Sequence, residues 1–127
     1  MTNTRRPWVI GPRGACGHWP ENTLPSIRGA HTLGADRVEV DAVLTRDGRV
    51  ALSHDLWLDA VTDVAARFPG RARADGRTYA ADLDWAEVQT LRVGARRDEA
   101  TGAPLFPARR LAGAGETGPC RLAHAVA

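Results

Sequence analysis

Two acidic residues, Glu39 and Asp41, lie one residue apart within an apolar run of β-type residues. Side chains two residues apart along a strand point to the same face, so both carboxylates are expected on one face of a strand. Two acids in an otherwise apolar strand are costly to bury unless a cation or hydrogen-bond donors meet them. The pair is therefore a candidate metal site, and the alternative is a strand face that lies in solvent.

A histidine, His54, closes the next apolar run and is flanked by Ser53 and Asp55. Imidazole is the side chain best suited to proton transfer near neutral pH. A hairpin that turns at residues 47–48 would set Asp41 opposite His54, and neighbouring strands of a parallel barrel would place both residues at the same strand ends. In either arrangement the carboxylates and the imidazole converge.

The elements around these residues begin as a βαβ unit. A loop rich in Gly and Pro at 12–22 precedes a helix with Asn22 or Thr23 as its N-cap and Gly34 as its C-cap. Residues 47–48, Asp-Gly, are a turn signal. The sequence therefore predicts strands at 8–10, 37–45 and 49–53, with the helix between the first two.

The segment after residue 58 is predicted to be less regular. Residues from about 59 to 83 are polar and punctuated by turn residues, and we interpret them as an inserted loop. A helix is expected from Asp84, which forms a capping-box pattern with Glu87, to Gly94. Its apolar stripe, assigned to the core, comprises Trp85, Val88 and Leu91.

Length and composition limit which classes of protein this chain can belong to. The chain has 127 residues, enough for one domain with a modest core, and its formal charge of +2 gives no support for nucleic-acid binding. No apolar run approaches the ~18 residues of a membrane span. The N-terminus lacks the apolar core of an export signal, so a cytoplasmic protein is expected. The distant Cys16 and Cys120 indicate unpaired thiols.

The last twenty residues, 108–127, lose every hydrophobic period. They are either a flexible tail or an out-of-frame reading. All 17 basic residues are Arg, which is typical of GC-rich coding, where a shifted frame stays open because stop codons are AT-rich. We therefore favour the second interpretation.

Six short blocks resemble, in order and spacing, the N-terminal signature of the glycerophosphodiester phosphodiesterases, a family of phospholipase-C-like barrels. They are Gly11–Gly14, Pro20–Thr23, Gly34–Asp36, Glu39–Asp41, Thr45–Gly48 and His54–Asp55. The resemblance implies an α/β fold, a partial (β/α)8 TIM barrel with only the N-terminal strands and helices present. Residues 1–107 would form this part, with the insertion at about 59–83 similar to that of one subgroup and with 108–127 divergent.

The resemblance also implies an activity and roles. The family hydrolyses glycerophosphodiesters, small molecules of lipid metabolism, to sn-glycerol 3-phosphate and an alcohol. Glu39 and Asp41 would bind a divalent cation, Ca²⁺ or Mg²⁺, and Arg13 would hold the phosphate with its fork of donors. His54 would be one of two histidines that transfer protons.

Two departures favour a rival interpretation. The first catalytic histidine of the family falls on Pro12, with His18 as a nearby but less probable substitute, and no later carboxylate matches the third metal ligand. The rival is a non-catalytic remnant, or a phosphate- or metal-binding module that needs a partner. Half a barrel would also expose an unpaired sheet edge through which copies could self-associate.

Overall fold

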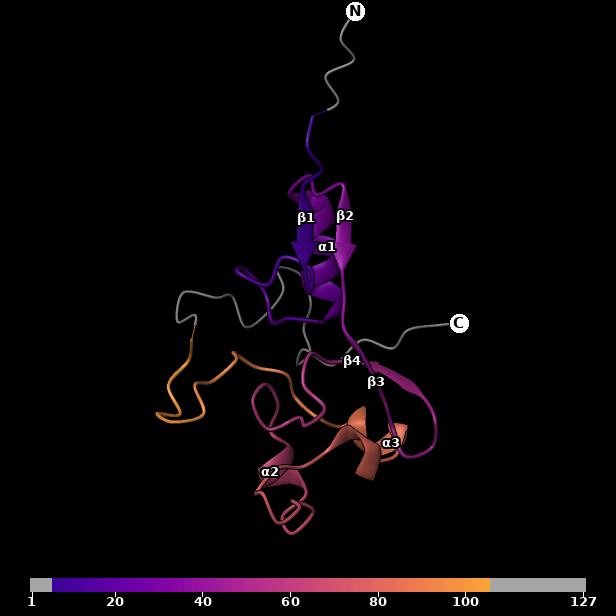
Figure 1. Cartoon of the computed structure of the whole chain (residues 1–127), viewed down its shortest axis with the longest axis vertical. Coiled ribbons are helices and arrows are strands. Elements are labelled where there is room, and N and C mark those ends of the chain that lie inside the picture. The colour runs from indigo at the N-terminus through magenta and orange to yellow at the C-terminus, as the bar shows by residue number, and fades with distance from the viewer. Residues whose placement is uncertain (1–5, 106–127) are drawn as a thin grey trace, which may run out of the picture.

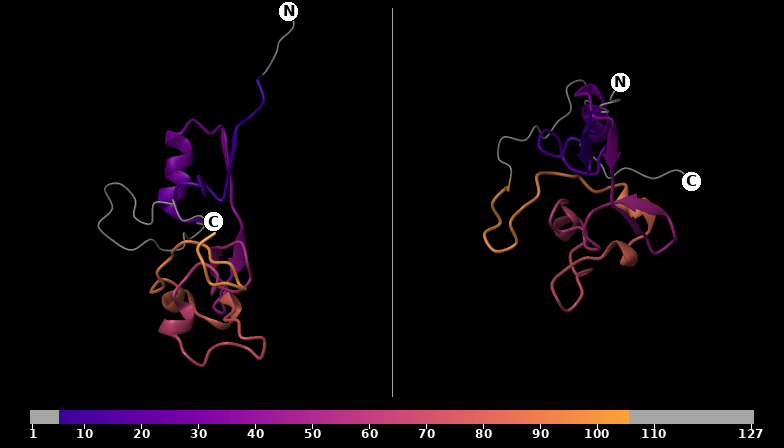
Figure 2. Two further views of the ribbon diagram at one scale, coloured as in Figure 1. Left: turned by 90° about the vertical axis from the view of Figure 1, so that its left-hand side faces the viewer. Right: turned by 45° about the horizontal axis from the view of Figure 1, so that its top comes forward.

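The computed structural model describes residues 6–105 and begins with the expected βαβ unit, although its first strand covers residues 10–12 rather than the predicted 8–10. Strand β1 (Ile10–Pro12) and strand β2 (Arg37–Glu39) are parallel, with Pro12 paired to Glu39, and helix α1 (Leu24–Thr32) connects them. Figure 1 shows this unit at one end of the molecule, apart from the remaining elements, and the views in Figure 2 agree. The unit places the ends of β1 and β2 toward the rest of the chain.

Helix α1 begins and ends where its capping residues predict. The Thr23 hydroxyl accepts a hydrogen bond from the Ser26 backbone N–H at 3.4 Å, and Pro25 occupies the first turn, where no backbone donor is needed. Leu33 is the C-cap, and Gly34 follows with φ of 85°, the left-handed geometry that glycine adopts freely. The expected N-cap at Thr23 is confirmed, whereas Gly34, expected as the C-cap, is the residue that follows the C-cap.

The single acidic strand expected at 37–45 is wrong. Strand β2 ends at Glu39, and the chain then leaves the first sheet and forms strand β3 (Ala42–Leu44) in a second one. The backbone N–H of Asp41 donates to the Asn22 side-chain carbonyl at 3.3 Å, a bond that takes the place of a ladder partner. Glu39 and Asp41 therefore do not lie on one face of a continuous strand.

Strand β3 pairs with strand β4 (Val50–Leu52) in an antiparallel hairpin whose register differs by one residue from the expected register. Asp41 lies opposite Ser53, whose N–H donates to the Asp41 carbonyl at 3.1 Å, rather than opposite His54. The reason is a three-residue loop closed by Thr45 and Arg49, with Gly48 at φ of 75°, in place of a two-residue turn.

The main hydrophobic core lies beneath this hairpin and draws on the segment expected to be an irregular loop. That segment contains helix α2 (Val64–Arg67) and the 3₁₀ helix η1 (Ala80–Asp82), so the expectation of a plain polar loop is wrong. The core comprises Val43, Ala51, Leu58, Ala60, Val61, Val64, Ala80, Leu83, Val88, Leu91 and Val93. Figure 1 shows these elements gathered at the end opposite α1.

Helix α3 (Trp85–Val88) is shorter than predicted, because it does not continue to Gly94. Its capping box is present, with the Asp84 N–H donating to the Glu87 carboxylate at 2.9 Å. Beyond Leu91, which is buried, the Arg92 N–H donates to the Asp63 carboxylate at 2.8 Å. Backbone donors that would extend the helix are thus committed to the segment before α2.

Several large apolar side chains face solvent around the βαβ unit. Ile10, Leu24 and Leu33 are each at least half exposed, whereas Val88, assigned to the core from the sequence, is buried. In the described residues, no helix has the length and apolar character needed to cross a membrane. The predicted divergent tail at 108–127, with Cys120, lies outside the described residues.

Candidate functional site

The loop after β1 holds Arg13 in a left-handed conformation, φ 54°, between two closely packed glycines. A side chain on Gly14 (φ 86°) would come within 2.7 Å of the Ser26 carbonyl oxygen, and one on Gly11 within 2.9 Å of the Gly14 carbonyl oxygen. The Arg13 carbonyl accepts hydrogen bonds from the Ser26 hydroxyl and the Asn22 N–H, both at 3.0 Å. The loop is therefore fixed against the start of α1.

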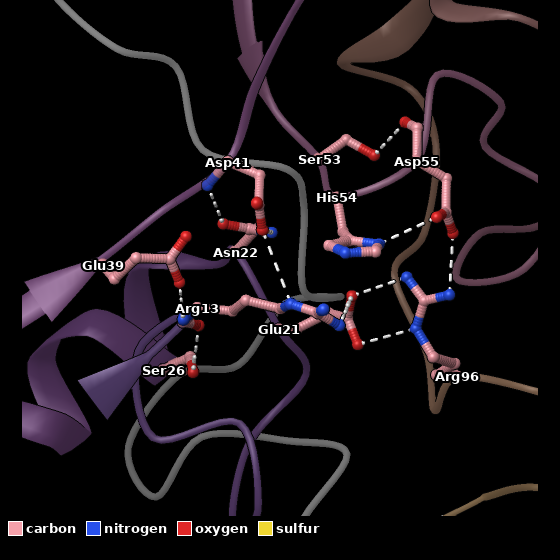
Figure 3. Close-up of polar contacts among 10 residues, drawn as sticks. All are labelled: Arg13, Glu21, Asn22, Ser26, Glu39, Asp41, Ser53, His54, Asp55 and Arg96. Carbon is pink, nitrogen blue, oxygen red and sulfur yellow. Dashed lines mark hydrogen bonds and ion pairs between the residues drawn. The ribbon is translucent and has the colours of Figure 1, made fainter. Parts of the chain in front are cut away.

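The two predicted metal-binding carboxylates converge on this loop although their strand is broken. Glu39 accepts from the Arg13 backbone N–H at 3.2 Å, and Asp41 forms an ion pair with Arg13 Nε at 3.5 Å. Asn22, itself left-handed with φ of 55°, donates its side-chain amide to Asp41 Oδ2 at 3.3 Å. Figure 3 shows Glu39 at the Arg13 backbone and Asp41 at the Arg13 side chain.

A buried carboxylate, Glu21, lies on the other side of Arg13. Its side chain is 3% exposed and contacts Arg13 Nη1 at 3.2 Å. Arg96 binds both Glu21 oxygens, through Nε at 3.0 Å and Nη2 at 2.7 Å, and its Nη1 donates to Asp55 Oδ2 at 2.7 Å. The hydrogen bond with Glu21 raises the pKa of Arg96 further, despite burial, so the guanidinium stays charged at every relevant pH.

His54 joins the same group of charges through Asp55. The distance between His54 Nδ1 and Asp55 Oδ1 is 2.8 Å. Burial opposes ionisation of Asp55, but hydrogen bonds from Arg96 and His54 outweigh it and hold the pKa of the Asp55 carboxyl below its usual range. Ser53 donates its hydroxyl to the Asp55 carbonyl rather than to His54, so it is not placed as a nucleophile.

All four residues proposed from the sequence for the site therefore belong to one continuous polar network (Figure 3). Four further members come with them: Glu21, Asn22, Asp55 and Arg96. The first two stand in the Pro20–Thr23 block, and Asp55 follows His54 directly, so motifs signalled all three. Arg96 carried no signal, because its partners are 41 and 75 residues away in the chain.

The donor set suits a hard divalent cation only in part. Glu39 and Asp41 offer carboxylate oxygens, the ligands that Mg²⁺ and Ca²⁺ prefer. Within residues 6–105, however, no group of three Asp, Glu, His or Cys side chains is arranged to hold a metal ion. The pair would therefore supply two protein ligands, with water or substrate oxygens completing the coordination.

Pro12 occupies the position next to the carboxylates, since it pairs with Glu39 in the parallel ladder. His18 lies elsewhere in the loop, where its ring packs against Trp19 with centroids 5.7 Å apart and lines an apolar cavity with Pro12 and Leu33. Of the two residues, Pro12 is therefore the one paired with a carboxylate of the site, whereas the His18 ring packs on Trp19.

Comparisons with known proteins point to one family. The family model of the glycerophosphoryl diester phosphodiesterase family matches residues 13–111. A glycerophosphodiester phosphodiesterase of Haemophilus influenzae is 41% identical over 103 residues, 80% of this chain and 28% of the relative. A glycerophosphoinositol inositolphosphodiesterase of Mus musculus is 38% identical over 108 residues, 85% of this chain and 19% of that protein.

Solved structures agree with this result. A phosphodiesterase of Oleispira antarctica, in complex with the product sn-glycerol-3-phosphate, is 34% identical with a TM-score of 0.54, covering 67% of this chain and 30% of the other. The crystal structure of a candidate glycerophosphoryl diester phosphodiesterase from Silicibacter pomeroyi gives a TM-score of 0.69 at 28% identity, with 94% and 39% covered. These neighbours are TIM barrels, and the chain described here is a partial α/β fragment of that fold that spans about a quarter of its curated relatives.

Proposed function

This chain belongs to the glycerophosphoryl diester phosphodiesterase family, and on that premise we propose that its site serves the metal-dependent hydrolysis of a glycerophosphodiester to sn-glycerol 3-phosphate and an alcohol. The observation that carries the proposal is the convergence of Arg13, Glu39 and Asp41 with the His54–Asp55 pair in one network. Residues 1–107 act in it as the N-terminal part of the barrel, with the insertion at about 59–83.

The chain's own residues suit the binding of a phosphodiester. The Arg13 guanidinium is about a quarter exposed and is held by single contacts to Glu21 and Asp41, so its remaining donors are available to phosphate oxygens. Glu39 and Asp41 would hold a divalent cation, Ca²⁺ or Mg²⁺, which would neutralise phosphate charge and orient the attacking hydroxyl.

His54 is suited to moving a proton. Its Nδ1 faces the Asp55 carboxylate, which leaves Nε2 on the solvent side of a ring whose side chain is 41% exposed. In this orientation Nε2 takes the proton of an attacking hydroxyl or returns one to the leaving oxygen, while Asp55 holds the ring and stabilises its charged form.

A second candidate function rests on Pro12. Proline has no titratable side chain, and it stands beside Glu39 where the family places its first histidine. A site with Arg13 and both carboxylates intact but without that histidine would bind phosphate and metal with little turnover. The rival function is therefore a phosphate- and metal-binding module, completed by a partner.

Hydrolysis is tested by incubating the chain with glycerophosphocholine and Mg²⁺ or Ca²⁺ and measuring the sn-glycerol 3-phosphate released. Glu39→Gln and Asp41→Asn remove the negative charges with little change of shape, and Asp75→Asn, on the far 59–83 segment, is the matched control. Release that a chelator and both site variants abolish, but the control keeps, supports the phosphodiesterase. If the chain binds sn-glycerol 3-phosphate but releases none from glycerophosphocholine, the result supports the rival function. If the chain shows no binding and no hydrolysis, both functions are refuted.

A further inference from the structure

The guanidinium of Arg96 lies between two carboxylates that come from distant parts of the chain (Figure 3). Three of its donors bind them: Nε and Nη2 bind Glu21, at 3.0 and 2.7 Å, and Nη1 binds Asp55 at 2.7 Å. The three side chains are 16%, 3% and 13% exposed, in the order Arg96, Glu21, Asp55. Such short, largely buried, charge-assisted contacts are strong and directional.

We propose that Arg96 is a positioning residue of this site, which holds Asp55 so that His54 keeps its proton on Nδ1 and presents Nε2 as the acceptor. The proposal deepens the proposed function and rests on His54 being its proton-transfer group. Arg96 itself contacts neither the proposed phosphate position nor His54, so it acts through Asp55.

The division of the Asp55 oxygens explains how the effect is transmitted. Oδ2 accepts from Arg96, whereas Oδ1 faces His54 Nδ1 at 2.8 Å. A carboxylate held at one oxygen by a rigid planar fork has its other oxygen fixed in direction. That fixed oxygen accepts a hydrogen bond only from an imidazole that carries its proton on Nδ1, and so it selects this tautomer.

The contact of Arg96 with Glu21 has a consequence for Arg13. Glu21 is almost fully buried, and the Arg96 fork engages both of its oxygens, while Arg13 contributes one weaker contact at 3.2 Å. Without Arg96, the buried Glu21 charge would draw in Arg13, because a buried carboxylate needs a cationic partner. Arg96 therefore leaves Arg13 donors available to an anionic ligand.

A simple structural role for Arg96, in which it only ties residue 96 to the loop after β1, predicts a different result. In that case, loss of the Arg96 contacts lowers the free energy of unfolding, but the tautomer of His54 in the folded protein does not change. The tautomer of His54 is therefore the property that separates the two roles.

The test is ¹⁵N NMR of the histidine side chains in the 127-residue chain, at about pH 8.5, above the ordinary histidine pKa of about 6.5. The His54 signals are assigned by their loss in His54→Gln. We expect protonated Nδ1 and unprotonated Nε2 in the unchanged protein, and in Arg96→Gln a shift to the Nε2–H tautomer. The control is Arg73→Gln, which breaks a similar two-bond contact, with Asp82, on an exposed surface.

The outcomes are decisive in both directions. An Nδ1–H form lost in Arg96→Gln and kept in Arg73→Gln supports the proposal. A tautomer unchanged in a folded Arg96→Gln protein, or an unchanged protein that already lacks the Nδ1–H form, overturns it. If Arg96→Gln does not fold, Arg96→Lys decides instead: a gain of Nε2–H supports the positioning role, and no gain overturns it. None of these measurements needs turnover, so the test of the His54 tautomer and the test of hydrolysis can fail independently of one another.

Discussion

Pro12 and Glu39 are partners across the parallel β1–β2 ladder, so the side chain at position 12 lies on the same side of the sheet as the Glu39 carboxylate. Position 12 also directly precedes Arg13, whose backbone N–H binds Glu39 at 3.2 Å. A titratable side chain at position 12 would therefore border both the phosphate-binding and the metal-binding groups of the proposed site.

Pro12→His should accordingly raise the rate of glycerophosphocholine hydrolysis by at least ~100-fold once the later strands of the barrel are supplied, the usual contribution of a positioned general acid or base. In the 127-residue chain alone, the change should not restore hydrolysis. The rate of sn-glycerol 3-phosphate release is measured in both proteins with metal supplied. If the 127-residue chain gives no turnover, the pair is compared after joining residues 1–107 to the later strands of the Haemophilus influenzae relative. If hydrolysis is measurable and its rate is the same with Pro12 and with Pro12→His, position 12 is not the missing catalytic position, and His18 becomes the residue to test.

Metal binding should be weak and should depend on both acids of the site. Because the site offers only two protein carboxylates, we expect a Ca²⁺ dissociation constant at the weak end of the range of protein sites, on the order of 10⁻⁴–10⁻³ M. Calorimetry should detect this binding in the unchanged chain and lose it in the Glu39→Gln, Asp41→Asn double variant. Glu99→Gln, which removes an exposed acid paired with Arg77, is the control. Undiminished binding in the double variant would refute the site assignment.

The Asp55 carboxyl should make stability depend on pH in the acid range. Its pKa is lowered in the folded protein, because hydrogen bonds from Arg96 and His54 outweigh burial. Its contribution is therefore fully present above the unfolded pKa of about 3.9 and is lost as pH falls through the lower folded pKa. In Asp55→Asn this acid-dependent part of the free energy of unfolding should vanish.

Denaturant unfolding at a series of pH values from about 5 downward measures the dependence on Asp55. His54→Gln serves as the comparison, because it leaves the Asp55–Arg96 contact in place. In this variant the free energy of unfolding should still change with pH, but less steeply than in the unchanged chain. A slope in Asp55→Asn as steep as in the unchanged chain would show that other carboxyls carry the effect.

Gly14→Ala should destabilise the loop that carries Arg13. The new methyl group would meet the Ser26 carbonyl oxygen at 2.7 Å, and φ of 86° is strained for any residue with a β carbon. We expect a loss on the order of 1–3 kcal/mol or more in the free energy of unfolding. Gly17→Ala, in the same loop with no atom within 4 Å of the added carbon, should change stability by less than about 1 kcal/mol.

Self-association is expected from the open side of the βαβ unit. In the described residues the β1–β2 sheet has only two strands, and Leu24 and Leu33 are 50% and 59% exposed nearby. Exposed edges and apolar patches promote association. Light scattering should show an average molar mass that increases with protein concentration. The increase should be smaller in the double variant Leu24→Gln, Leu33→Gln. A constant monomer mass in the unchanged chain would contradict this expectation.

The sequence by itself determined the helix caps and turns, each of which depends on only a few neighbouring residues. The cap at Thr23, the glycine after α1, the capping box at Asp84 and the turn at Gly48 all follow from backbone geometry within a few positions. Glu39, Asp41, Arg13 and His54 could likewise be proposed as site residues, because each stands in a short block with a recognisable order.

Only the tertiary structure decided how these residues meet. The strand breaks between Glu39 and Asp41 because the Asn22 side chain supplies the hydrogen bond that a continuous ladder would have provided. Asp41 faces Ser53 because the hairpin loop has three residues, a one-residue difference that local signals do not resolve. Arg96 enters the site because it pairs with the buried Glu21 and the partly buried Asp55, which are far apart in the chain, and no local pattern encodes that pairing.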